Sequence, residues 1–238
     1  MAEWFEEWFG EEYLRLYPHR NEADAERVVL LLRQALPWRS GWRVLDVACG
    51  AGRHLAALER SGAVPFGFDL SSPLLRRAKQ NTARPLVRAD MRWLPFRTAS
   101  MDLTVNLFTS FGYFAADEEH NDAIGQMLRT VRPGGWLVID FLNAEQVRAD
   151  LVPEETVNYG GARVEIRRRI SADDRFVQKS IRLIDGRQFE ERVRLLEATD
   201  LERMIQSHGA RVEGRYGDYS GAQLAAGPRT ILLAQVPA

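Results

Sequence analysis

Two acidic residues and a glycine turn between them have the residue types and the spacing of a ligand-binding site. Asp46 lies in an apolar run, residues 44–47, and the turn Gly50-Ala51-Gly52 follows closely. Glycines between a strand and a helix let a ligand approach the backbone, and the start of the helix offers free N–H groups. Asp69 comes 17 positions after Gly52, close to the spacing of about 20 expected for a carboxylate that binds ribose hydroxyls. The pattern therefore predicts a nucleoside ligand.

Charge distinguishes two kinds of nucleoside ligand for this turn. A dinucleotide fingerprint needs a third glycine at position 55, where the chain has Leu55, and it would place a pyrophosphate beside Asp46. Two unit charges about 4 Å apart interact by roughly 4 kcal/mol at an effective dielectric near 20, so Asp46 disfavours a phosphate and favours a cation. A ligand with an ammonium, a carboxylate and an adenosine fits this requirement. S-adenosylmethionine is such a ligand.

Asp90 and Met91 are expected to extend the site to the adenine ring. They follow a third apolar run, residues 85–88. The carboxylate would accept a hydrogen bond from the exocyclic amine, and the methionine would cover one face of the ring.

The elements that would position these residues alternate between apolar runs and helical segments from about residue 43 to residue 141. This alternation is typical of a parallel sheet covered by helices. Ser72 is expected to cap one helix, with Pro73 in its first turn. The sequence predicts strands at 44–47, 64–69, 85–88, 101–106 and 136–141, and helices at 53–60, 72–79 and 118–131.

Beyond Asn143 the pattern changes to extended segments at 162–170, 176–184 and 189–196, with Asp185-Gly186 as a hairpin turn. These segments predict an antiparallel insertion at 151–197. A capping box from Thr199 to Glu202 is expected to open a helix that ends at Gly209, before a closing strand pair at 211–216 and 230–236. The predicted fold is a single α/β domain over residues 1–238. Its core is a Rossmann-like, doubly wound, mostly parallel sheet of seven strands, and the antiparallel strand insertion follows the fifth strand.

The N-terminal segment, residues 1–40, is expected to form a helical cap with helices at 4–16 and 23–36. Two interpretations apply to it. In the first, the segment between Tyr13 and Arg20 folds over the ligand as a lid: Tyr13 and Tyr17 cover the methionine and acceptor side, and Arg20 pairs with the carboxylate of the ligand. In the second, the aromatic helix end, with Trp8, only packs on the core.

Composition restricts the partners. The 32 basic and 33 acidic residues give a net charge of -1, which offers no overall field for nucleic acid or a membrane surface. The single cysteine, Cys49, excludes an intrachain disulfide and a cysteine zinc site, and no metal is expected. The acidic N-terminus and the lack of a run of about 18 apolar residues predict a cytoplasmic protein with a small soluble partner.

Over residues 43–143 the chain resembles the class I S-adenosylmethionine-dependent methyltransferases. The matching motifs are the loop at 46–52, the acidic strand end at 67–71, the segment at 88–91, the strand at 102–106 and the segment at 128–136. Within that family the chain is most similar to the small-molecule branch, which includes glycine and amino-sugar N-methyltransferases. In that branch a strand insertion after the fifth strand helps to build the substrate site. Ala48 departs from the glycine of many members and should narrow the space beside the methionine moiety.

The resemblance implies a role for each matching residue. Asp46, Ala48, Gly50 and Gly52 would lie at the methionine portion, Asp69 at the ribose, Leu70 and Met91 against adenine, Asp90 near its amine, and Asn106 and Leu107 beside the sulfonium. The acceptor would enter along residues 106–114, which lack the Asn-Pro-Pro-Tyr type of motif found in nucleic-acid amino-methyltransferases. There Phe111, Tyr113 and Phe114 either wall the acceptor pocket or pack against the next helix.

Methyl transfer by in-line displacement mainly requires orientation of the nucleophile and exclusion of water. An N or O nucleophile is expected, and a dedicated base is optional because neutral amines can attack unaided, whereas a hydroxyl usually needs one. The histidines are predicted at the surface or at helix ends: His19, His54, His120 and His208. The arginines at 163–182 either bind an anionic acceptor or contact nucleic acid, or they form a solvated strand face. Two other functions stay open: a non-catalytic module that binds the same cofactor, and a nicotinamide-dependent oxidoreductase, which Leu55 and Asp46 disfavour.

Overall fold

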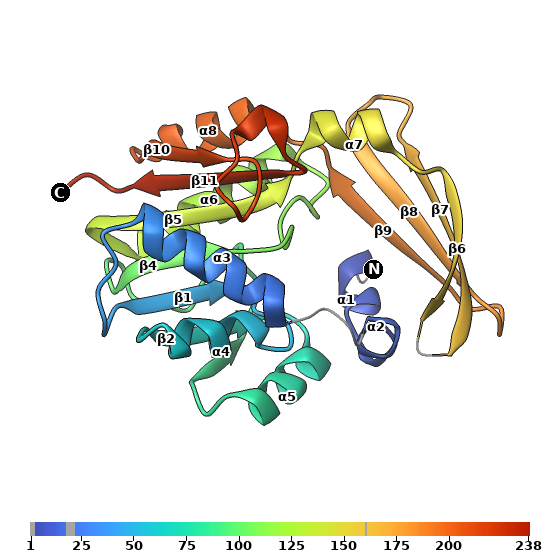
Figure 1. The fold of residues 1–238 in the computed structure, drawn as a ribbon, viewed down its shortest axis with the longest axis horizontal. Helices are drawn as coiled ribbons and strands as arrows, with labels where there is room; N and C mark the ends of the chain where they lie inside the picture. The colour runs from blue at the N-terminus through green and yellow to red at the C-terminus, as the bar shows by residue number, and fades with distance from the viewer. Residues whose placement is uncertain (1–2, 18–21, 160) are drawn as a thin grey trace.

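The main sheet of the protein has seven strands in the order β10-β11-β5-β4-β1-β2-β3 (Figure 1). The computed structural model describes residues 3–17, 22–159 and 161–238. Strands β1 to β5 run parallel, whereas β11 pairs antiparallel with β5, and β10 antiparallel with β11. The predicted doubly wound sheet is confirmed. Its strands are β1 Arg43–Val47, β2 Val64–Asp69, β3 Leu86–Arg88, β4 Met101–Asn106, β5 Val131–Leu142, β10 Arg211–Tyr216 and β11 Arg229–Gln235.

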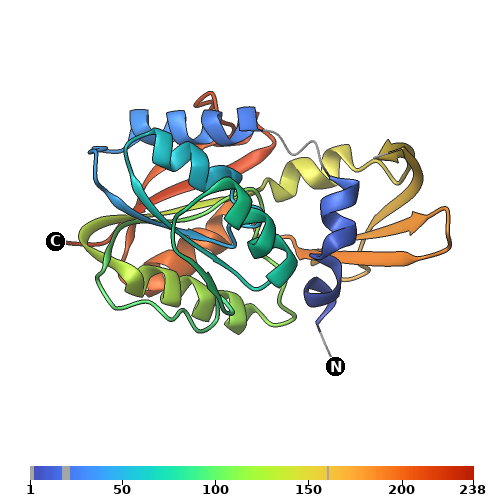
Figure 2. The same cartoon turned by 90° about the horizontal axis from the view of Figure 1, so that it is seen from below.

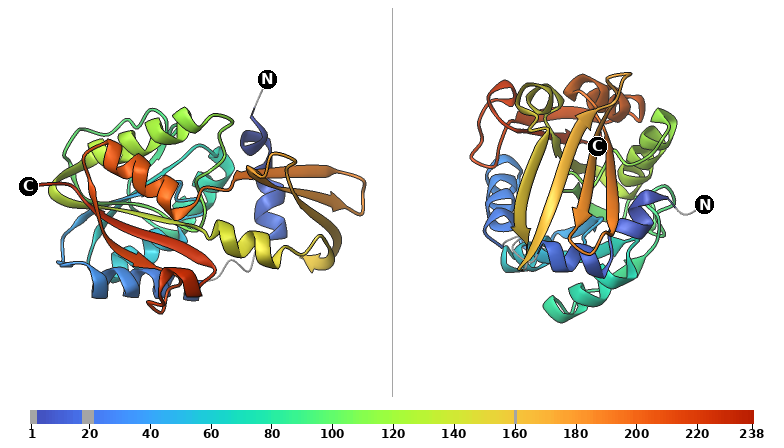
Figure 3. Two further views of the ribbon diagram at one scale, coloured as in Figure 1. Left: turned by 90° about the horizontal axis from the view of Figure 1, so that it is seen from above. Right: turned by 90° about the vertical axis from the view of Figure 1, so that its right-hand side faces the viewer.

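Helices cover both faces of this sheet (Figure 2). Val44 of β1 packs with the helices of one face and Leu45 with those of the other, because successive side chains of a strand point to opposite faces. On the first face lie α3 (Glu22–Ala35) and α4 (Arg53–Arg60); on the second lie α6 (Asp117–Thr130) and α8 (Ala198–Ser207), which Figure 3 shows side by side. The domain also contains α5 (Ser72–Asn81), α7 (Ala144–Asp150) and the 3-10 turn Leu224–Ala226.

A second, antiparallel sheet of four strands stands apart from the first (Figures 1 and 3). Its strands are β6 Glu154–Tyr159, β7 Ala162–Ile170, β8 Phe176–Leu183 and β9 Gln188–Arg194. The three predicted segments correspond to β7, β8 and β9, and β6 was missed. In β6 only Val157 and Tyr159 are large and apolar, so its alternation is weak, although the glycine pair at 160–161 is a hairpin signal in the sequence.

The described N-terminal segment lies between the two sheets (Figure 1). The single helix expected at 4–16 is wrong, because α1 (Trp4–Trp8) ends before Gly10 and α2 (Glu11–Leu16) begins after it. Gly10 is extended, at φ -126° and ψ -155°, and glycine is a poor helix former. Trp8 and Leu16 are buried against Val164, Ile166, Ile181 and Leu183 of the four-stranded sheet.

Two predicted helix starts are also wrong. Ser71 caps α5 instead of Ser72, because its side chain accepts a hydrogen bond from the backbone of Leu74 and Ser72 is already helical. The N-cap residue of α8 is Glu197 instead of Thr199, and the side chain of Asp200 accepts a hydrogen bond from its backbone N–H at 3.1 Å. Glu202, expected in the capping box, instead forms an ion pair with Arg215 at 2.6 Å.

In the described ranges, no helix is both long enough and apolar enough to cross a membrane.

Candidate functional site

A cavity of about 1020 Å³ opens at the carboxyl ends of the parallel strands, beneath α1 and α2. Ligands of open α/β sheets bind at this edge, where the strand order reverses between β1 and β4. Most residues predicted for the site line the cavity: Ala48, Gly50, Asp69, Leu70, Asp90, Met91, Leu107, Tyr13, Tyr17, Phe111, Tyr113 and Phe114. Asp46, Gly52 and Asn106 lie behind these lining residues. Arg20 and His19 fall outside the described residues.

The turn after β1 leaves room for a ligand at Gly50. Gly50 has φ 55°, and a Cβ added there would meet nothing within 4 Å. Gly52 has a different role, because a Cβ added there would lie 3.1 Å from the Cβ of Ala78. Gly52 therefore permits the close approach of α4 to α5, while Gly50 keeps the cavity open.

Asp69 connects the two loops that border the cavity. One carboxylate oxygen accepts a hydrogen bond from the backbone N–H of Gly50 and the other from that of Ser71, each at 2.8 Å. Burial raises the pKa of Asp69, and these backbone hydrogen bonds oppose the rise. Asp69 also lines the cavity, so its remaining lone pairs are available to ligand hydroxyls.

Asp46 is a buried carboxylate with an unsatisfied oxygen. Its side chain is 1% exposed, and Oδ2 has no hydrogen-bond partner. Burial, reinforced by the charge of Asp69, raises the pKa of Asp46 to about 8. A cation nearby would stabilise the ionised form. Together with the open turn at Gly50, this orphan oxygen fits a ligand with a cationic group, as S-adenosylmethionine has.

Asp90 is engaged by a neighbouring arginine. Arg92 donates to both carboxylate oxygens of Asp90 and also contacts Glu119 at 2.6 Å and Glu3 at 3.0 Å. These hydrogen bonds, led by that of Asp90, raise the pKa of Arg92. An adenine amine would therefore share the carboxylate of Asp90 with Arg92.

Two histidines lie near the start of a helix, as expected, but are not at the surface. His54 of α4 and His120 of α6 are both buried. Burial lowers the pKa of His54 to about 3 and that of His120 to about 4, so both are neutral. His54 lines the cavity. His208 lies exposed at the end of α8, as predicted.

The aromatic residues after β4 belong both to the cavity wall and to the core. Phe111 is fully buried, with its ring centroid 5.3 Å from that of His120. Tyr113 packs on Trp4 at 5.1 Å, and its hydroxyl donates to the carbonyl of Thr109. Asn106 is not among the residues that line the cavity: its amide nitrogen donates to the carbonyls of Val47 and Ser110, and its Oδ1 is buried without a hydrogen-bond partner.

The described part of the N-terminal segment has contacts that fit both interpretations. Tyr13 and Tyr17 line the cavity, as the lid requires. On the other side, Trp8 is 1% exposed and donates to Glu191 at 2.7 Å, as packing requires. Lys179 of β8 donates to the hydroxyl of Tyr17 at 2.7 Å, so the second sheet is connected to the cavity wall.

Among the residues of the cavity wall that were not singled out from the sequence, Arg53 and Phe108 contact each other. The guanidinium of Arg53 lies 4.1 Å from the centroid of the Phe108 ring. Each directly follows a residue that was predicted, Gly52 or Leu107, and that proximity is the available signal.

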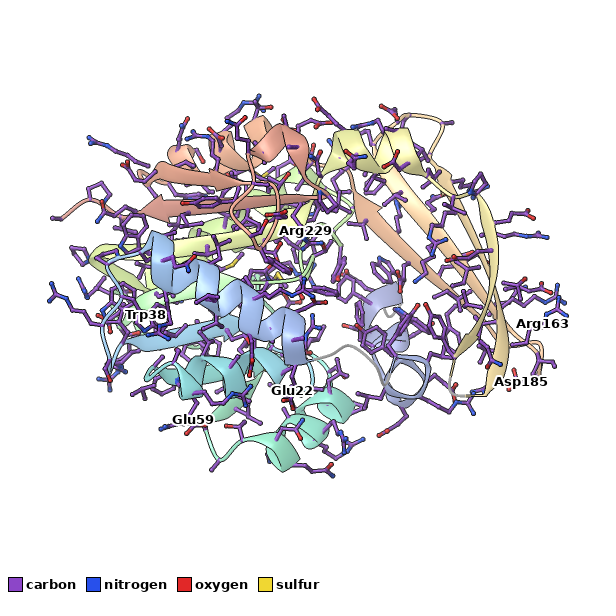
Figure 4. The ribbon with its side chains drawn as sticks, viewed as in Figure 1. Glu22, Trp38, Glu59, Arg163, Asp185 and Arg229 are labelled. Atoms are coloured by element: carbon purple, nitrogen blue, oxygen red, sulfur yellow. The ribbon has the colours of Figure 1, made fainter. Side chains whose placement is uncertain are left out.

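The arginines of the second sheet lie apart from the cavity. Figure 4 shows Arg163 near Asp185 at the outer edge of the molecule, distant from Arg229. Arg167 pairs with Glu154 at 3.3 Å with both side chains mostly exposed. These contacts fit a solvated strand face.

Comparison with known proteins shows that the chain is similar to methyltransferases. A family model described as a methyltransferase domain matches residues 44–135. A dTDP-3-amino-3,4,6-trideoxy-alpha-D-glucopyranose N,N-dimethyltransferase of Streptomyces venezuelae is 32% identical over 120 residues, which are 50% of this chain and 49% of the relative. The match thus spans about half the length of that relative. A dTDP-3-amino-3,6-dideoxy-alpha-D-glucopyranose N,N-dimethyltransferase of Streptomyces fradiae is 29% identical over 222 residues, 88% of this chain and 84% of the relative.

One solved structure extends the similarity to the whole fold. An S-adenosylmethionine-dependent methyltransferase from Clostridium acetobutylicum ATCC 824 superposes with a TM-score of 0.76 and 17% identity. The superposition covers 95% of this chain and 97% of that one, so the two share the same overall fold.

Proposed function

The chain belongs to the class I S-adenosylmethionine-dependent methyltransferases, enzymes whose cofactor is S-adenosylmethionine, and we propose that it methylates the amino group of a small amino-sugar acceptor. Both Streptomyces relatives are named for such sugars. The cavity is at the upper end of the range of roughly 300–1,000 Å³ for small-molecule sites. Its size supports a cofactor and a small acceptor bound together.

The side chains of the cavity supply binding and orientation. The bound cofactor provides an electrophilic methyl group on a sulfonium. In our proposal Gly50 admits the methionine end, the carboxylate of Asp46 balances its positive charge, and Asp69 accepts from the ribose hydroxyls. Leu70 and Met91 would cover the adenine. The aromatic residues Tyr13, Tyr17, Phe108 and Tyr113 would exclude water from the reacting atoms.

The observation that carries the choice of an amine is the burial of His54 in the cavity wall. Among the described residues that line the cavity, His54 is the one histidine. Burial lowers its pKa to about 3, so it is a poor proton acceptor. A hydroxyl usually needs such an acceptor, whereas a neutral amine attacks unaided. The aromatic faces also suit the methylammonium product, because cations bind over such rings.

The experiment combines cofactor binding with product analysis. Calorimetry should detect binding of S-adenosylmethionine and none of NADH. The purified protein is then incubated with dTDP-3-amino-3,6-dideoxyglucose and, as a matched control, with the sugar that carries a hydroxyl in place of the amine. We expect mass spectrometry to show addition of one or two methyl groups to the amine only. Methylation of the hydroxyl sugar would overturn the choice of nucleophile, and cofactor binding with no product from any amine would favour the non-catalytic module.

A further inference from the structure

Asp140 is a fully buried carboxylate on which three segments of the chain converge. It lies near the end of β5. Its Oδ2 accepts from the backbone N–H of Phe108 at 2.8 Å and from the hydroxyl of Tyr219 at 2.7 Å. Its Oδ1 accepts from Nε of Arg229 at 2.8 Å, with a second guanidinium nitrogen at 2.7 Å. A buried charge is costly unless it is paired and hydrogen-bonded, and here Oδ2 has two hydrogen-bond donors while Oδ1 has one donor and an ion-pair contact, all from the same three residues.

The segment that Asp140 holds has an unusual backbone. Phe108 and Thr109 both have φ 60°, so two consecutive residues with side chains adopt the left-handed conformation that normally favours glycine. The carboxylate of Asp140 binds the N–H of Phe108, and its own backbone carbonyl accepts from the N–H of Thr109 at 2.9 Å. Conformations of this kind persist only where the surroundings enforce them, and they cluster at functional sites.

This turn places Phe108 at the junction of the two halves of the cavity. The Phe108 ring lines the cavity, and the guanidinium of Arg53, next to the glycine turn, lies 4.1 Å from its centroid. The guanidinium of Arg229 is 5.5 Å from the same centroid. The ring, which belongs to the segment where the acceptor is expected to enter, thus contacts both Arg53, after the cofactor turn, and Arg229 of β11. A small displacement of the turn would move this wall.

We propose that Asp140 is a positioning residue for methyl transfer, which acts through the Phe108–Thr109 turn and is itself fixed by Tyr219 and Arg229. The inference rests on the proposed function. Asp140 touches neither substrate in this scheme. It sets where the Phe108 ring stands, and the ring sets how the acceptor meets the methyl group, an alignment to which transfer rates are sensitive.

The chain contains a matched control for this role. Asp102 in β4 also accepts from an arginine, Arg132 at 2.7 Å, and from a backbone N–H, that of Arg43 at 2.8 Å. Asp102 lies near the start of β4, whereas Asp140 lies near the end of the neighbouring parallel strand β5. The two carboxylates are therefore at opposite ends of this strand pair, and Asp102 is away from the cavity. Asp102→Asn therefore removes a similar carboxylate without disturbing the Phe108–Thr109 turn.

The test compares Tyr219→Phe, Asp140→Asn and Asp102→Asn. Tyr219→Phe deletes one hydroxyl and keeps the ring, so it should fold even where Asp140→Asn does not. With the amino-sugar acceptor, we expect Tyr219→Phe to lower kcat/KM about tenfold, through kcat and acceptor KM, with cofactor Kd within about twofold of wild type. Asp102→Asn should lower only Tm. In a Phe108→Ala background, Tyr219→Phe should lower kcat/KM little further, because Tyr219 is proposed to affect the rate only through the Phe108 ring.

A second readout does not need an acceptor. With Phe108 replaced by 4-fluorophenylalanine, fluorine NMR should give one sharp resonance in the otherwise wild-type protein and in Asp102→Asn. Tyr219→Phe should broaden or split it. Wild-type kinetics with an unchanged resonance in Tyr219→Phe would overturn the positioning role, as would additive effects of Tyr219→Phe and Phe108→Ala. Absence of turnover in the wild type with every amine would overturn the proposed function instead. The fluorine resonance would then still test whether Asp140 and Tyr219 fix the Phe108–Thr109 turn.

Discussion

The carboxylate of Asp69 accepts a 2.8 Å hydrogen bond from the backbone N–H of Gly50, so the acidic residue that ends β2 holds the glycine turn that follows β1. One side chain thus shapes the loop at the methionine end and faces the place proposed for the ribose. Removing it should therefore have two effects.

Asp69→Ala should weaken S-adenosylmethionine binding by roughly 1.5–3 kcal/mol, the scale of hydrogen bonds to a charged group. It should also lower Tm, because the N–H groups of Gly50 and Ser71 lose their acceptor. Calorimetry and thermal unfolding measure the two effects. The exposed Asp185→Ala is the control. Unchanged Kd in a folded Asp69→Ala protein would exclude the ribose role.

Cofactor affinity should rise with pH because of Asp46. Its raised pKa of about 8 means that the free protein carries Asp46 mainly protonated at pH 7, and a cationic ligand prefers the ionised form. Affinity should increase by up to about tenfold per pH unit below that pKa and level off above it. Titration calorimetry at several pH values measures this slope.

Asp46→Asn is the control for the pH series, because it leaves the titration of the ligand itself in place. The variant should show a flatter pH profile, and it should bind S-adenosylmethionine more weakly while binding of adenosine is less affected. An equal loss for both ligands would mean that Asp46 only supports the loop.

The two glycines of the turn should respond differently to alanine. Both have positive φ, so each substitution carries a backbone penalty of about 1–2 kcal/mol. Gly52→Ala adds a clash with Ala78 and should lose more stability, whereas the new methyl of Gly50→Ala enters open space where the ligand would lie. Gly50→Ala should therefore lose more cofactor affinity. The opposite ranking in Kd and Tm would contradict these assignments.

Deleting residues 1–20 separates the lid from simple packing. The lid predicts a folded protein with weaker cofactor binding and little turnover, because Tyr13 and Tyr17 leave the cavity wall. Packing predicts loss of stability with unchanged affinity per folded molecule. The internal control is Trp8→Ala, which should cost about 3–5 kcal/mol by emptying a fully buried position while it leaves both tyrosines. Unchanged cofactor affinity per folded molecule in the protein that lacks residues 1–20 would reject the lid.

The parallel half of the fold is predictable because its signals are local. Apolar runs mark β1 to β5, and the turn at Gly50 is readable directly from the sequence. The position of β6 depends on pairing with β7, since its own residues alternate too weakly. Asp140 looked like an ordinary strand residue because its partners Tyr219 and Arg229 lie 79 and 89 positions away. The burial of His120 could not be predicted for the same kind of reason, because its ring packs against Phe111 and Phe114 across a loop.

The place of β11 in the sheet also sets an order for synthesis. Residues up to Leu142 supply the five parallel strands and the glycine turn, but β11 is the last strand to leave the ribosome. Until it pairs with β5, Arg229 and Tyr219 are not available to Asp140. Since chains fold from the N-terminus during translation, the cofactor half of the cavity can form first. The wall at Phe108 is then the last part of the cavity to be set, so a chain interrupted before β11 would lack a finished acceptor side.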